Sequence, residues 1–96
     1  MPVKDYATKV KGKKKDEIFL FALSTCGWCA KTKKMFNSLG IEYRYIDVDL
    51  VEDEKRDEVM EEFERWNPDE SFPTIVINNK KCIIGFREEE LKEILK

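Results

Sequence analysis

The apolar residues of the chain fall into short runs whose spacing changes from one stretch to the next. Residues 18–23 form a continuous apolar run that is too short for a typical helix, which predicts a central strand buried on both faces. Residues 41–48 alternate between the two sides of an extended chain, which predicts a second strand. The apolar runs 74–77 and 81–84 flank an Asn-Asn-Lys turn, and together they predict a hairpin.

Helical spacing of apolar residues separates these predicted strands. Residues 32–39 have this spacing and are followed by Gly40, a residue typical of helix ends. A second helix is expected from about Asp53, read as its cap, to position 66, and a third over residues 88–96. The predicted order is therefore β-α-β-α-β-β-α. Its first half is a parallel βαβ unit, and its second half is an antiparallel hairpin with a helix.

The first residues of the chain are strongly basic. Residues 1–15 contain six lysines and one acid, Asp5, which raises the possibility of a nucleic-acid-binding arm. No nucleic-acid motif surrounds them, so a solvated tail or hairpin is favoured and no nucleic-acid partner is expected. We divide the chain into an N-terminal basic extension or edge strand, residues 1–16, and a domain of residues 17–96.

Length and composition limit the class of protein. The chain has 96 residues, of which 42% are hydrophobic and 40% charged, with a mean hydropathy of −0.57. One domain with one modest core is expected. No apolar stretch approaches the roughly 20 residues of a membrane span, and the first residues lack the apolar stretch of a secretory signal. We therefore expect a cytoplasmic protein that does not bind membranes.

Cysteine is the residue type that carries candidate chemistry. Histidine is absent, which excludes Cys-His nucleophile pairs. The three cysteines are Cys26, Cys29 and Cys82, and this odd number argues against a purely structural disulfide framework. A structural zinc site needs four ligands, so no metal site is expected. Cys82 lies among apolar residues, which favours a buried side chain over a third redox thiol.

The Cys26-Gly27-Trp28-Cys29 motif lies where the first predicted strand meets the first predicted helix. Unpaired backbone N–H groups and the helix dipole favour negative charge at such a point, so Cys26 is expected to favour its thiolate form. Nearby lysines add to this field; they are Lys31, Lys33 and Lys34. Cys29 lies one helical turn further on the same face, close enough to form a disulfide with Cys26. An inert core pair and a structural disulfide are less favoured alternatives.

With these residues in place, the chain resembles the glutaredoxin family within the thioredoxin-like fold. The resemblance covers residues 17–96 and depends on three segments, 26–29, 72–74 and 85–87, in the order and approximate spacing of the family. It implies an α/β fold with a four-stranded mixed sheet in the order 2-1-3-4. Two helices are then expected on one face of the sheet and one on the other.

The resemblance also implies roles for individual residues. Cys26 would be the exposed nucleophile and Cys29 the resolving thiol of a thiol–disulfide oxidoreductase. Pro73 would follow a cis peptide bond and face the two sulfurs, and the backbone of Phe72 would pair with bound substrate. The expected substrate-binding residues are Thr25, Gly27, Trp28, Phe72, Pro73, Gly85 and Phe86.

Two positions depart from the relatives that use glutathione. Leu23 replaces a basic residue three positions before the first cysteine, and residues 84–88 lack a Gly-Gly segment with an acidic pair. The Gly-Phe-Arg run is more similar to the glutaredoxin-like hydrogen donors of ribonucleotide reductase. The expected partners are a disulfide-containing protein and, as electron donor, a flavoprotein disulfide reductase or glutathione.

The expected oxidoreductase is a monomer without a cofactor. Two other functions remain open on the sequence. The alternative is an iron–sulfur glutaredoxin, a dimer that binds a cluster through Cys26, because Gly27-Trp28 loosely fits the motif of such proteins. A non-catalytic interaction module is the third possibility, and it would lack disulfide-reducing activity.

Overall fold

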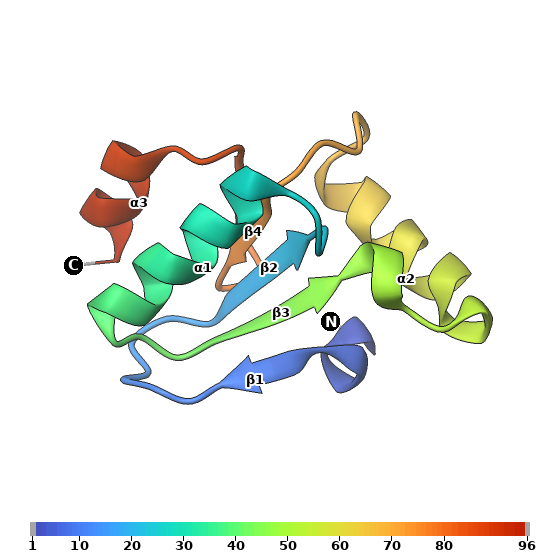
Figure 1. Ribbon diagram of the computed structural model, residues 1–96, viewed down its shortest axis with the longest axis horizontal. Coiled ribbons are helices and arrows are strands. Elements are labelled where there is room, and N and C mark those ends of the chain that lie inside the picture. The colour runs from blue at the N-terminus through green and yellow to red at the C-terminus, as the bar shows by residue number, and fades with distance from the viewer. Residues whose placement is uncertain (1, 96) are drawn as a thin grey trace.

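A five-stranded mixed sheet runs through the centre of the computed structural model, which describes residues 2–95 (Figure 1). The strands lie in the order β1-β3-β2-β4-β5. Their bounds are Thr8–Val10 for β1, Ile18–Ala22 for β2, Tyr43–Asp47 for β3, Thr74–Ile77 for β4 and Lys81–Ile84 for β5. The β2–β3 pair is parallel and the other pairs are antiparallel. The carboxyl ends of β2 and β3 therefore meet at one end of the sheet.

Helices cover both faces of this sheet. The α-helices are α1 (Gly27–Leu39), α2 (Asp53–Trp66) and α3 (Glu88–Ile94), and the short 3₁₀ helices are η1 (Pro2–Tyr6) and η2 (Val48–Leu50). Figure 1 shows α1 and α3 on one face and α2 on the other, which is the arrangement expected from the sequence. Among residues 2–95, no helix is long and apolar enough to cross a membrane.

The central strand β2 supplies side chains to two separate cores. All five of its residues are buried. Ile18, Leu20 and Ala22 pack towards α1 and α3, whereas Phe19 and Phe21 pack towards α2. This division follows from the alternation of side chains along a strand, and burial on both faces explains the uninterrupted apolar run. Each fully buried phenylalanine contributes about 1.5–3 kcal/mol relative to an exposed one.

The sheet has a fifth strand at its edge, beyond the four that the resemblance implies, and this strand lies in residues 1–16, for which an edge strand was one of two alternatives. The four expected strands are present in the expected relative order, and β1 adds an antiparallel neighbour to β3 (Figure 1). Val3 is fully buried in the core beneath α2, and the Lys13 backbone N–H donates to the Gly40 carbonyl oxygen at 2.8 Å. A Cβ atom at Gly12 would lie 2.6 Å from the Ile41 carbonyl carbon, so this close approach requires glycine.

The ends of the helices agree only in part with the sequence-based expectations. The end of α1 at Gly40 is confirmed, with a left-handed φ of 66° at that glycine. The expectation that Asp53 caps α2 is wrong. Glu52 is the cap, without a side-chain cap hydrogen bond, and Asp53 lies in the first turn, where the helix dipole also favours a carboxylate. The third helix ends at Ile94. Lys96, where it was expected to end, lies outside the described residues.

Candidate redox site

Cys26 lies in the turn between the carboxyl end of β2 and the start of α1. It is the N-cap of α1, with extended backbone angles of φ −87° and ψ 118°. Its side chain is partly exposed, and its Sγ accepts a hydrogen bond from the Cys29 backbone N–H at 3.2 Å. The sulfur therefore takes the place that Ser or Asp oxygens occupy in ordinary helix caps. A backbone donor and the N-terminal end of the α1 dipole are therefore both directed at this sulfur.

Cys29 occupies a very different environment one turn further along α1. Its side chain is fully buried, with 0% exposure. Burial raises the pKa of the Cys29 thiol to about 12, and the neighbouring Cys26 also raises it, whereas the Leu23 backbone and the Lys33 charge lower it. Cys29 therefore keeps its proton at neutral pH in the dithiol form. The sequence motif alone does not distinguish the two thiols in this way.

The segment before β4 contains the proline singled out from the sequence. The Phe72–Pro73 peptide bond is cis, as expected. The Pro73 carbonyl oxygen accepts a hydrogen bond from the Gly85 backbone N–H at 2.8 Å, which ties the segments 72–74 and 85–87 together. The Phe72 ring stacks on Phe63 of α2, with centroids 4.8 Å apart. The contact of Pro73 with the two sulfurs stays a prediction.

An aromatic pair lies beside the cysteine turn. Trp28 is 57% exposed, and its ring stacks on Phe86 with centroids 5.8 Å apart and an interplanar angle of 28°. The Lys31 ammonium lies 4.6 Å from the centroid of the Trp28 ring. Thr25 and Gly27 are exposed, in the turn and at the first position of α1. The structure thus brings the 26–29 segment next to the 85–87 segment.

Two polar contacts near the site were not anticipated from the sequence: one is a hydrogen-bonded pair and the other is an ion pair. The Asp49 carboxylate accepts hydrogen bonds from both the backbone N–H and the hydroxyl of Ser24, and these bonds lower the pKa of Asp49. The Lys33 ammonium lies 3.0 Å from Asp47. Asp47 lies two positions after Tyr45 on β3, so the two side chains share the face of the sheet that α1 covers.

Cys82 lies away from this site, on edge strand β5. It pairs with Val76 of the core beneath α2, and its thiol donates to the Trp66 carbonyl oxygen at 3.5 Å. Side chains of cross-strand partners point to the same face of a sheet, so Cys82 lies on the face that α2 covers. Cys29 lies in the core on the other face, beneath α1 and α3. Burial raises the pKa of Cys82. The structure therefore does not bring the third thiol to the other two.

Comparison with known proteins agrees with this geometry. The family model described as glutaredoxin matches residues 18–83. An uncharacterised glutaredoxin-like 8.6 kDa protein of the rubredoxin operon in Clostridium pasteurianum is 30% identical over 78 residues, covering 81% of this chain and 96% of the relative.

Two solved archaeal structures are similar over nearly the whole chain. The glutaredoxin of Methanosarcina mazei Go1 is 43% identical with a TM-score of 0.83, covering 93% of this chain and 86% of the other. The methanoredoxin of Methanosarcina acetivorans is 40% identical with a TM-score of 0.87, covering 92% and 94%. Sequence, fold and the paired cysteines agree: this chain belongs to the glutaredoxin family.

Proposed function

We propose that the protein is a thiol–disulfide oxidoreductase that reduces disulfide bonds of other proteins through Cys26 and Cys29. The observation that carries the proposal is the unequal environment of the two thiols. Cys26 is partly exposed at the N-terminus of α1, whereas Cys29 is fully buried one turn away. An accessible nucleophile next to a protected second thiol is the arrangement that disulfide exchange in two steps requires.

The reaction begins at the exposed sulfur. The Cys26 thiolate attacks one sulfur of the substrate disulfide, which breaks that bond and forms a mixed disulfide, and the departing substrate sulfur leaves as a thiolate that takes up a proton. The Cys29 thiol then loses its proton and attacks Cys26. This step forms the Cys26–Cys29 disulfide and releases the second substrate sulfur. The substrate gains two electrons, and the two cysteines lose them.

The substrate groove is proposed to surround Cys26. The exposed Trp28 and the partly buried Phe86 provide an aromatic wall beside it, of the kind that protein interfaces favour. The other residues proposed to contact the substrate are Thr25, Gly27, Phe72, Pro73 and Gly85. We further propose that the protein works as a monomer in the cytoplasm, because a reducing compartment keeps the dithiol in its active form.

Reduction of a model protein tests the proposal. Insulin turbidity in the presence of dithiothreitol should rise much faster with the wild-type protein than without it, and the Cys26→Ser, Cys29→Ser double variant should match the blank. Equal rates for wild type and double variant would contradict the proposal. A coloured dimer after anaerobic purification would instead favour the iron–sulfur alternative.

The electron donor is tested in the same assay with dithiothreitol omitted. Glutathione with its reductase is compared with a thioredoxin-reductase-type flavoprotein, each with NADPH. We propose the flavoprotein as the donor, since Leu23 and Arg87 occupy positions where glutathione-using relatives differ. Faster reduction with glutathione would contradict that choice, without affecting the roles of the cysteines.

A further inference from the structure

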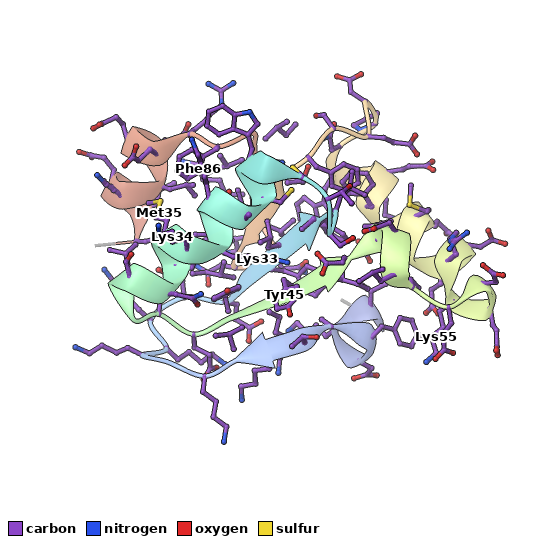
Figure 2. The ribbon with its side chains drawn as sticks, viewed as in Figure 1. Lys33, Lys34, Met35, Tyr45, Lys55 and Phe86 are labelled. Atoms are coloured by element: carbon purple, nitrogen blue, oxygen red, sulfur yellow. The ribbon has the colours of Figure 1, made fainter. Side chains whose placement is uncertain are left out.

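A lysine on α1 is fixed in place close to the buried thiol. Lys33 follows Cys29 by four positions, a spacing that makes two helical side chains neighbours on one face. Its ammonium lies 3.0 Å from a carboxylate oxygen of Asp47 and 4.1 Å from the centroid of the Tyr45 ring. Figure 2 shows Lys33 and Tyr45 between α1 and β3, with Lys34 directed away from Tyr45.

This ion pair differs from the surface ion pairs of the same protein. The Lys33 and Asp47 side chains are only 24% and 15% exposed, whereas pairs such as Arg65–Glu61 are 67% and 73% exposed. Partial burial reduces screening by solvent, and a charge held by a carboxylate and an aromatic face loses its freedom to move. Lys33 is thus a positive charge of fixed position.

The surroundings of Cys29 explain why such a charge matters for its reaction. Cys29 must become a thiolate to attack the mixed disulfide, yet burial disfavours that charged form. Cys26 faces it from the N-cap, and the carboxylates of Asp47 and Asp49 lie at the carboxyl end of β3 and in η2. Asp47 is paired with Lys33, and Asp49 accepts hydrogen bonds from Ser24. Burial and the Cys26 sulfur both disfavour a negative charge on Cys29, whereas the Lys33 charge favours it.

We infer that Lys33, which Asp47 and Tyr45 hold in place, is a positioning residue for the second half of the reaction. This inference rests on the proposed function. The Lys33 ammonium favours the Cys29 thiolate at the moment of attack on the mixed disulfide. The Cys29 proton passes to water, the Cys26–Cys29 bond forms, and the substrate sulfur departs with the electron pair of the broken bond and is then protonated. The step needs no other reactant.

Rapid mixing with excess dithiobis(nitrobenzoate) separates the two halves of the reaction. The variants carry Cys82→Ala, so that only two thiols react. Attack by Cys26 releases the first coloured thiolate at a rate proportional to reagent concentration, and attack by Cys29 releases the second at a rate independent of it. The second rate is followed against pH in Lys33→Met, in Lys33→Arg and in Lys34→Met, a matched control because Lys34 is exposed on the same helix.

In Lys33→Met, the pH midpoint of the second phase should rise by about one unit and its rate at pH 7 should fall about tenfold, with a much smaller change in the first phase. Lys33→Arg should restore both values, and Lys34→Met should leave them at wild type. An unchanged second phase in Lys33→Met, or an equal slowing of both phases, would overturn the inference. Absence of a second phase in the parent protein would instead contradict the proposed function.

Discussion

The start of α1 contains a fully buried cysteine and edge strand β5 a partly buried one, but only the first of these regions is arranged for disulfide exchange. Cys29 is fully buried next to the Cys26 sulfur, with Lys33 one turn away. Cys82 is partly exposed, faces α2, and donates its thiol hydrogen to the Trp66 carbonyl oxygen. Burial raises the pKa of both thiols.

The difference teaches that burial alone does not assign a role to a cysteine. What separates Cys29 from Cys82 is a second sulfur within one helical turn, which is partly exposed at the N-terminal end of α1. Without such a partner, Cys82 behaves as a small apolar side chain, as free cysteines usually do. The predictions below test this contrast from its strongest consequence to its weakest.

Replacing Cys26 should have the largest effect. In Cys26→Ser, the protein loses its attacking sulfur, and insulin reduction should fall by about 100-fold or more. Turbidity assays at equal protein concentration measure this loss, with circular dichroism as a check that the variant is folded. If Cys26→Ser keeps roughly a tenth or more of the wild-type rate, another thiol is the nucleophile.

Replacing Cys29 should slow turnover and also change what accumulates. Cys29→Ser leaves the first attack intact but removes the thiol that resolves the mixed disulfide, so an adduct on Cys26 should build up. Intact-mass and peptide spectrometry after mixing with a disulfide substrate detects it. The assignment of the two roles is reversed if Cys29→Ser abolishes all reactivity while Cys26→Ser forms the adduct.

Truncating Trp28 should weaken substrate binding without removing the chemistry. In Trp28→Ala, the aromatic wall with Phe86 is lost, and KM for a protein disulfide should rise about tenfold, the equivalent of about 1.4 kcal/mol. Leu39→Ala is the matched control, since Leu39 is 43% exposed at the other end of α1. Equal effects of the two substitutions on KM would argue against a substrate-binding role for Trp28.

Replacing Cys82 should have the smallest effect. Cys82→Ala removes a partly buried thiol with one weak hydrogen bond, so the protein should lose about 1 kcal/mol of unfolding free energy or less and keep its wild-type rate. Urea denaturation and the insulin assay measure these two quantities. A clear loss of activity in a stably folded Cys82→Ala would show that β5 takes part in the redox cycle.

Most of the fold follows from local sequence pattern. The apolar run over residues 18–23 indicated a strand buried on both faces because β2 supplies both cores, and Gly40 marked the end of α1. Strand β1 has no such pattern. It spans three residues that include the exposed Lys9 and have no continuous apolar pattern, and it is held by pairing with β3.

The candidate site was predictable only in part, because some of its contacts are local in sequence and others form only when the sheet assembles. The spacing of Cys26 and Cys29 is local, so the sequence revealed the pair. The Lys33–Asp47 ion pair joins α1 to β3, and it depends on the parallel register that places Ala22 beside Asp47. Such a register is a property of the assembled sheet, and no local pattern contains it.

The contrast between the thiols is tested most directly by alkylating the reduced wild-type protein with a small excess of iodoacetamide and mapping the modified peptides. At pH 7, Cys26 should be modified first, with Cys29 and Cys82 unmodified. Because burial raises the pKa of Cys29 to about 12, this thiol keeps its proton as the pH rises, and Cys29 should stay unmodified up to about pH 10. Modification of Cys29 or Cys82 before Cys26, or at an equal rate, would contradict the account.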